Sequence, residues 1–472
     1  MSASTHSRLI GPVGTLVSGS GVAFLVAYLA KPILLRLYPA SDFGIVEFVV
    51  ALVGVLIPVA SLRYEDAVVL PEDDEQAAAV WRLSLGLTLL TTGLSAVGVW
   101  LFAPLAPEAV RPWLWTVPGL LLLLRAAKLA ELWLTRHKRF ALLSGGGVAQ
   151  SITTTASRIG LGVVGAGPAG LLGGFALGHG LSALVWLRET RKRWPADRAP
   201  SAVRAAAHRY RRFAQFASPA ALINALATRL PFLLLIGAFG AEVLGWFSQA
   251  FAVLYVPLAL VGTAVAQVFF VTAAEAFRAG SLRRETAEAH RLLVWAGLVP
   301  LAGVCGAAPD VFSFVFGEEW REAGAYAARL APWIFMTAVA SPLTRVFDVT
   351  ERQSVDLWVN AFNLAVVSTG IWLAVSQEDP LAGMTWLGIT GFLARAAQAA
   401  VALHVAEVPG RSALLHYVVP LLAGTATFAA VHVAGTLLSP AGTTGVFAGC
   451  LVLWALVLAE VVRRQVAQSS QA

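Results

Sequence analysis

The sequence is poor in charged residues and has only two cysteines. Charged side chains make up 13% of the 472 residues, roughly half the share found in an average soluble domain. Cys305 and Cys450 both lie in apolar stretches, where buried thiols are expected rather than a disulfide framework. The composition therefore argues against an ordinary soluble enzyme and against a disulfide-stabilised secreted domain.

Motifs for catalysis and for nucleotide binding are missing as well. The sequence has no P-loop, no HExxH, no CxxC and no Gly-x-Ser-x-Gly, each of which would place a known chemistry. Its eight histidines are scattered singly, so we predict no metal site and no cofactor. The net charge of +7 is explained by basic cytoplasmic loops rather than by a nucleic-acid surface. These absences argue against an enzyme and a primary pump.

Long apolar runs are what the sequence does contain. Hydrophobic residues make up 58% of the chain and its mean hydropathy is +0.73. Because a helix needs about 20 mostly apolar residues to cross a bilayer, the runs predict an all-α polytopic membrane protein with about fourteen transmembrane helices. The predicted spans are 11–34, 43–62, 81–104, 113–133, 142–164, 169–187, 213–236, 243–271, 291–315, 325–345, 356–376, 382–403, 412–436 and 442–462.

The placement of lysine and arginine predicts the orientation of these helices. The longest connection, residues 188–212, is rich in arginine, and basic loops favour the cytoplasmic side. With this loop inside, nearly all basic clusters fall inside, so both termini are predicted to be cytoplasmic. An even number of spans follows, and twelve remains an alternative to fourteen.

A weak internal repeat divides the chain at the same basic loop. Gly44 opens one predicted helix and Gly245 opens another, with similar apolar runs after each and prolines at Pro58 and Pro257. We therefore predict two pseudo-symmetric six-helix lobes, residues 1–195 and 196–408, followed by two additional helices in 409–472. Parallel repeats of this kind are a common plan of transporters that bind substrate between the lobes.

Charged residues inside the predicted helices are the candidate site. Ionisable groups in a membrane are costly and usually face a cavity or a partner. Most of the candidates are basic, which suits an anionic ligand such as phosphate or diphosphate. Arg158 and Arg229 lie deepest and are the preferred ligands, whereas the others have interfacial or helix-pairing alternatives, including an i,i+3 pair of Lys128 with Glu131. The full candidate set is Lys31, Arg36, Glu47, Arg125, Lys128, Arg158, Arg229 and Arg395.

Several local patterns in residues 30–190 carry a family resemblance. They are Arg36 to Tyr38, Phe43-Gly44, Leu62-Arg63-Tyr64-Glu65, and the acidic Leu70-Pro71-Glu72-Asp73. Together they resemble bacterial polysaccharide flippases of the O-antigen and capsule type, in the multidrug/oligosaccharidyl-lipid/polysaccharide exporter superfamily.

The resemblance implies a transporter, not an enzyme. It implies that the protein moves undecaprenyl-pyrophosphate-linked oligosaccharide across the bacterial cytoplasmic membrane by alternating access. It also implies polysaccharide polymerase and glycosyltransferases as working partners. A drug or cation antiporter of the same superfamily is the alternative, although the helices offer few deep acids for that role. A membrane polysaccharide polymerase is a third hypothesis, but the sequence predicts no extended catalytic loop of the kind that such an enzyme needs.

Overall fold

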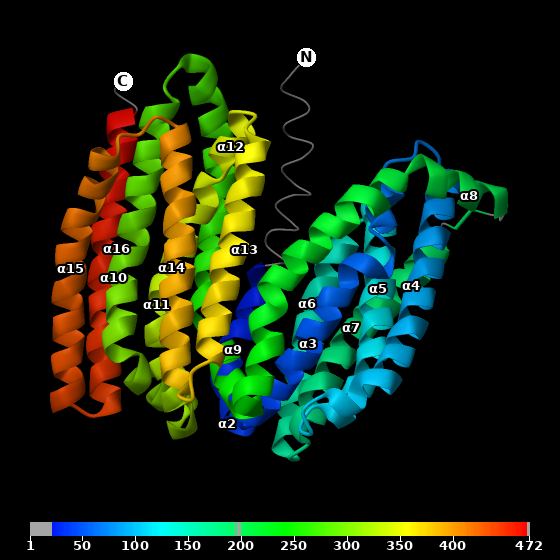
Figure 1. Ribbon diagram of the computed structural model, residues 1–472, viewed down its shortest axis with the longest axis horizontal. Helices are drawn as coiled ribbons and strands as arrows, with labels where there is room; N and C mark the ends of the chain where they lie inside the picture. Colours follow the sequence, from blue (N-terminus) through cyan, green and yellow to red (C-terminus); the bar gives the residue numbers. More distant parts are fainter. Residues whose placement is uncertain (1–20, 193, 196–199, 470–472) are drawn as a thin grey trace. The chain divides into compact units, whose positions relative to one another are not determined.

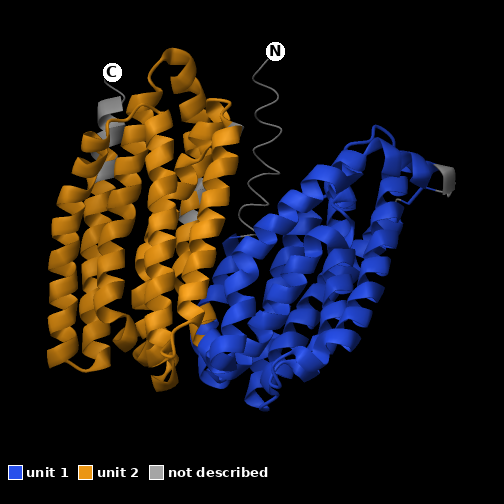
Figure 2. Cartoon of the chain, in the orientation of Figure 1, with its two compact units in different colours: residues 1–245 blue, residues 246–472 orange. Residues whose placement is uncertain are grey.

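The computed structural model describes residues 21–192, 194–195 and 200–469, and almost all of them are helical. The chain divides into two compact units, residues 1–245 and 246–472 (Figures 1 and 2). Ten helices of the described part are long and apolar enough to cross a membrane. The chain is therefore a multi-pass helical membrane protein, as its hydropathy predicts.

Unit 1 is built from long helices joined by short turns and one basic connection. A helix over residues 21–29 runs into α2, and a short 3-10 segment, Tyr64–Val69, follows α3. The elements are α2 (Lys31–Leu37), α3 (Ala40–Ala60), α4 (Asp74–Phe102), α5 (Thr116–Arg136), α6 (Phe140–Val163), α7 (Gly167–Arg191), α8 (Pro200–Arg209) and the beginning of α9 (Ser218–Ala279).

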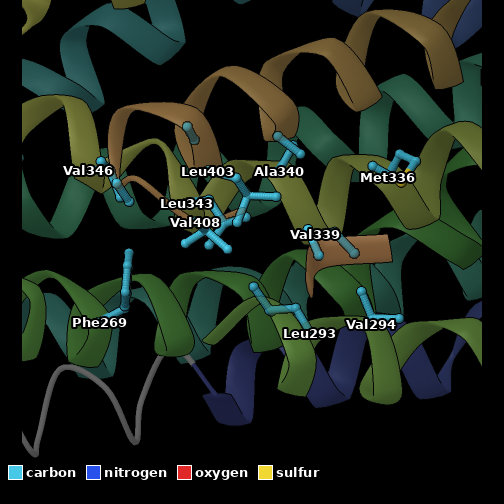
Figure 3. Packing of buried hydrophobic residues seen from close by; sticks show 14 of the residues in the cluster. Phe269, Leu293, Val294, Met336, Val339, Ala340, Leu343, Val346, Leu403 and Val408 are labelled. Carbon is cyan, nitrogen blue, oxygen red and sulfur yellow. The ribbon is translucent and has the colours of Figure 1, made fainter. Parts of the chain in front are cut away.

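Unit 2 contains the rest of α9 and an apolar core between its helices. The remaining elements are α10 (Leu282–Phe316), α11 (Arg321–Leu343), α12 (Arg345–Val349), α13 (Gln353–Val375), α14 (Pro380–Val405), α15 (Gly410–Leu437) and α16 (Pro440–Ser469). Figure 3 shows the core, in which Leu293 and Val294 of α10 and Val339 and Leu343 of α11 are buried together. In a bilayer such packing holds helices together chiefly through van der Waals contact.

The predicted fold class is confirmed, and the helices fit the fourteen that hydropathy indicates. The first helix, α5 and α6 lie outside the ten, and one of the ten, Phe213–Ala259, runs past Gly240 into the second half of α9. The first helix reaches Leu37 rather than ending at residue 34, and residues 11–20 of the predicted span lie outside the described residues. The sequence also did not predict α8, which forms inside the basic connection.

A single residue separates the two halves of α9. Gly240 has φ 87° and ψ 178°, a conformation that only glycine adopts without strain. The helix therefore restarts at Ala241, close to the predicted start of a new span at residue 243. α9 is thus two helices in physical terms.

The two glycines of the internal repeat lie against each other. A Cβ on Gly44 would be 1.8 Å from the carbonyl oxygen of Ala241, and a Cβ on Gly245 would be 1.8 Å from the carbonyl oxygen of Ala40. Both glycines and both alanines keep the offset of the repeat, so the contact is reciprocal. Small residues that permit close backbone approach are typical of helix packing in membranes. The predicted division at residues 195/196 and 408/409 concerns repeat symmetry and stays a prediction.

Candidate functional site

One face of α6 lines a cavity and carries mostly small and polar residues. The cavity-facing positions of this helix are Phe140, Leu143, Ser144, Gly147, Gln150, Ser151, Thr154, Thr155 and Arg158. Steps of three and four residues keep these positions on one side of a helix. From Phe140 to Arg158 this face spans about 27 Å at about 1.5 Å per residue.

This face of α6 lines a cavity of about 640 Å³ inside unit 1. α7, which packs along α6 (Figure 1), contributes Phe175, His179 and Trp186 to the wall. Glu131 and Thr135 of α5 lie at the end where α6 begins, and Arg158 lies near the other end of α6. Ligand sites commonly enclose about 300–1,000 Å³, so the cavity is large enough for a small polar ligand or part of a larger one.

Arg158 is held in place by one hydrogen bond and one aromatic ring. Its Nε donates to the carbonyl oxygen of Leu171 at 3.0 Å, and its guanidinium lies 5.8 Å from the ring centroid of Phe175. The hydroxyl of Tyr38 donates to the backbone carbonyl oxygen of Arg158 at 2.6 Å. Among the described residues the terminal nitrogens of Arg158 have no hydrogen-bond partner, so the planar fork keeps donors for an anion.

Three of the predicted basic residues interact with Glu47. Electrostatic interactions join Glu47 of α3 to Lys31 of α2, to Arg158 and to Arg229 of α9, and they also join Lys31 to Arg158. The Nε of Arg229 lies 3.0 Å from the position that a Cβ on Gly54 would take. The structure therefore brings together four of the eight predicted residues, with three basic side chains around one carboxyl.

A second polar group in the cavity is a hydrogen-bonded chain of three side chains. The Nε2 of Gln150 and the Nε2 of His179 are 2.9 Å apart, and the Nδ1 of His179 is 2.9 Å from the carbonyl oxygen of Phe175. The hydroxyl of Ser182 donates to the Oε1 of Gln150 at 2.9 Å. These hydrogen bonds link α6 to α7 and give the middle of the cavity an ordered polar group.

Arg125 and Lys128 form ion pairs within unit 1. Arg125 is 4% exposed and pairs with Glu65, which is 2% exposed; its Nη2 also donates to Ser61 Oγ at 3.0 Å. Lys128 pairs with Glu131 at 2.8 Å, which confirms the i,i+3 pair expected from the sequence. The Arg125 pair fastens the Leu62-Arg63-Tyr64-Glu65 turn to α5.

Arg36 and Arg395 are placed away from this cavity's wall. Arg36 is exposed in the last turn of α2. Arg395 lies on α14 of unit 2, where its Nη1 donates to the Oε1 of Gln398 at 2.7 Å. Neither contributes to the lining of the unit 1 cavity.

Sequence reasoning missed the uncharged part of the site. Charge inside an apolar run marks Arg158 as a candidate. The uncharged residues carry no such mark, and they are Gln150, Ser151, Thr154 and Thr155 on α6 and His179 and Ser182 on α7. The sequence does indicate a polar face for α6, because polar residues recur there at helical spacing from Ser144 to Arg158. No comparable signal joins Gln150 to His179, since that contact depends on how two helices pack.

Comparisons with known proteins agree with this architecture. A family model described as "polysaccharide biosynthesis protein" matches residues 33–325, well over half of the chain. The structure of the lipid II flippase MurJ in an inward closed conformation is similar with a TM-score of 0.74 at 9% identity, covering 96% of this chain and 99% of that one. A comparison with curated proteins gives no match.

Two further solved structures share the fold. An inward-facing multidrug resistance MATE family transporter of the MOP superfamily has a TM-score of 0.57 at 14% identity, covering 81% of this chain and 94% of that one. A MOP superfamily transporter from Pyrococcus furiosus has a TM-score of 0.52 at 15% identity, covering 84% and 96%.

The comparisons and the membrane spans define a multi-pass helical membrane protein with the fold shared by these flippase and multidrug-transporter structures. Within that class, the chain belongs to the polysaccharide biosynthesis protein family, as the N-terminal resemblance predicts.

Proposed function

We propose that the protein flips an undecaprenyl-diphosphate-linked oligosaccharide from the cytoplasmic to the outer leaflet of the bacterial cytoplasmic membrane by alternating access. Both of its termini are cytoplasmic in this proposal, and polysaccharide polymerase and glycosyltransferases are its working partners. The single observation that carries the proposal is the polar cavity of unit 1, which ends at the guanidinium of Arg158.

The chemistry of the cavity suits a lipid-linked sugar. Dragging hydroxyls and phosphates through hydrocarbon is costly because each loses its hydrogen bonds to water. A cavity with hydroxyl, amide and guanidinium groups replaces some of those bonds. The polyprenyl tail has no such need and stays in the lipid. Arg158, with Lys31 and Arg229 nearby, is the proposed contact for the diphosphate.

An antiporter for cationic drugs fits the same cavity less well. Such a transporter would need a carboxyl group in the cavity that can hold a proton or a cation. Among the described lining residues Glu131 is the carboxyl, and it is paired with Lys128. The flippase is therefore the function that the cavity supports best.

The test is transbilayer movement in liposomes containing the purified protein. The probe is radiolabelled undecaprenyl diphosphate carrying N-acetylglucosamine, and an impermeant phosphodiesterase that cleaves diphosphates reports its arrival outside. We expect Arg158→Gln to slow movement about tenfold or more, because hydrogen bonds to charged groups contribute about 1.5–3 kcal/mol. Arg284→Gln serves as the control, since Arg284 is an exposed arginine of unit 2 paired with Glu288 at 3.0 Å.

Two results would contradict the proposal. One is the absence of any protein-dependent movement of the probe. The other is export of ethidium against a proton or sodium gradient by the same liposomes while the lipid stays in its leaflet, which would replace the flippase by the antiporter.

A further inference from the structure

The unit 1 cavity divides into a cationic end and an uncharged polar length. Arg158 lies near the end of α6 at Val163, whereas Ser144, Gln150, Ser151 and Thr155 extend from it toward Phe140. Fourteen residues separate Ser144 from Arg158, about 21 Å at about 1.5 Å per residue. A diphosphate occupies only one end of such a length, so the rest must meet another part of the ligand.

The length between Arg158 and Ser144 offers hydrogen bonds and aromatic rings, and the carboxyl of Glu131 beyond it is paired with Lys128. Serine, threonine and glutamine side chains both donate and accept, which matches the hydroxyls of a sugar. Phe140, Phe175 and Trp186 also line the cavity, and aromatic rings pack against the C–H faces of pyranoses.

The His179 contacts fix the direction in which Gln150 presents its amide. A carbonyl oxygen only accepts, so the Nδ1 of His179 must carry the proton that it donates to Phe175. In the neutral imidazole Nε2 then accepts, and the nitrogen of the Gln150 amide must face it. The Oε1 of Gln150 accordingly faces Ser182, whose hydroxyl lies 2.9 Å from it and 3.0 Å from the carbonyl oxygen of His179, so one hydroxyl hydrogen is shared between two acceptors.

The same hydrogen bonds leave part of the Gln150 amide available for a ligand. An amide has two donor hydrogens and two acceptor lone pairs, and the contacts with His179 and Ser182 use one of each. One N–H and one lone pair remain on a group whose orientation is already set. A preorganised donor and acceptor on the same side chain can bind a sugar hydroxyl at little entropic cost.

We infer that the cavity binds its ligand in a fixed register, with the diphosphate at Arg158 and the neutral sugars along α6 past Gln150 toward Ser144. Gln150 is the residue that selects for the glycan, and His179 and Ser182 are positioning residues that hold its amide. The inference rests on the proposed function and adds to it which residues read the sugar.

The experiment compares two lipids in the liposome assay described above. One is bare undecaprenyl diphosphate, and the other carries three N-acetylglucosamine units. For each variant the quantity of interest is the ratio of the three-sugar rate to the bare rate. We expect Gln150→Leu to lower this ratio about tenfold, as lost ligand hydrogen bonds would. Arg158→Gln should slow both lipids and keep the ratio within about twofold of the wild type.

Four further variants keep the test decisive. Thr155→Val preserves side-chain volume and should lower the ratio about threefold, so the inference does not depend on the folding of one variant. Ser182→Ala removes the positioning hydroxyl and should lower the ratio. Gln150→Asn should also lower the ratio, because its shorter amide cannot reach His179. Thr88→Val is the matched control, since the Thr88 hydroxyl is fully buried in α4 without a partner and outside the cavity lining.

The outcomes separate this inference from the proposed function. If the wild type moves both lipids but Gln150→Leu and Thr155→Val leave the ratio unchanged, the sugar register is wrong and the flippase stands. If the wild type moves neither lipid, the proposed function fails and the register with it. A lowered ratio in Thr88→Val as well would also overturn the register, because the effect would not be confined to the cavity.

Discussion

The two units of this protein are both all-helical, yet their interiors differ in kind. Among the described residues the buried side chains of Asp, Glu, Lys or Arg are Glu65 and Arg125, and both belong to unit 1. Unit 1 also holds the polar cavity, whereas unit 2 has the extended apolar cluster around Leu343. Buried charges inside a membrane helix bundle are costly, so their burial in unit 1 is a difference in kind between the two interiors and agrees with the ligand site proposed there.

The difference also shows how the polar interior is kept stable. In unit 1 an ion pair fastens the turn after α3, and the hydroxyl of Tyr64 in that turn donates to the carbonyl oxygen of Ala207 in α8 at 3.0 Å. In unit 2 a polar contact between neutral side chains joins α10 to α15, where His290 contacts His416 and Tyr417. Unit 1 should therefore depend on the pairing of buried charges, and unit 2 on uncharged contacts and apolar packing.

The largest expected effect is on the buried ion pair of unit 1. Arg125→Met leaves the Glu65 carboxyl buried without its cation, which should lower the free energy of unfolding by about 3–5 kcal/mol. The double variant Arg125→Met with Glu65→Leu should recover most of that loss, because no charge remains to be desolvated. Denaturant unfolding in detergent measures both.

The control for this prediction is an exposed pair in unit 2. Arg284→Met removes the ion pair with Glu288, and surface pairs contribute little, so the unfolding midpoint should stay where it is. A double variant that is no more stable than Arg125→Met alone would mean that Arg125 acts through packing rather than charge.

A somewhat smaller effect distinguishes the two interiors by packing. Leu343 is fully buried in the core of unit 2, whereas Leu143 is 8% exposed and lines the cavity of unit 1. Leu343→Ala should lower the free energy of unfolding by about 2–5 kcal/mol because it leaves a new void. Leu143→Ala only enlarges an existing cavity, so its cost should be less than half as large. Equal losses, measured by the same unfolding assay, would contradict the proposed difference between the units.

The smallest expected effects concern two buried tyrosine hydroxyls. The hydroxyl of Tyr417 in unit 2 is 3.1 Å from the Nε2 of His290, and that of Tyr38 in unit 1 donates to the backbone carbonyl of Arg158. Tyr417→Phe leaves a buried imidazole nitrogen unpaired and should cost about 1–3 kcal/mol. Tyr38→Phe should cost about 1 kcal/mol, because the carbonyl that it leaves is part of a helix. Thermal unfolding of the two variants side by side checks this order, and a larger loss in Tyr38→Phe would reverse it.

Much of the architecture follows from the sequence because a bilayer restricts what a chain can do. Backbone groups in hydrocarbon must bond internally, so apolar runs of span length had to become helices, and their number and approximate ends could be read directly. Gly44 and Gly245 stood out as equivalent positions, and the structure places them in reciprocal contact. The family was also accessible, because its local patterns lie in contiguous segments such as Leu62 to Glu65.

The site could be predicted only in part, and the reason is the range of its interactions. The cost of burying Arg158 is a property of one residue in one helix, so the sequence alone marked it as a candidate. Whether Arg125 meets Glu65, or Gln150 meets His179, depends on the rotation and approach of separate helices. Local sequence thus determined the helices, the family and the deepest charge, while tertiary packing decided which charges are neutralised in pairs and which polar side chains share a cavity.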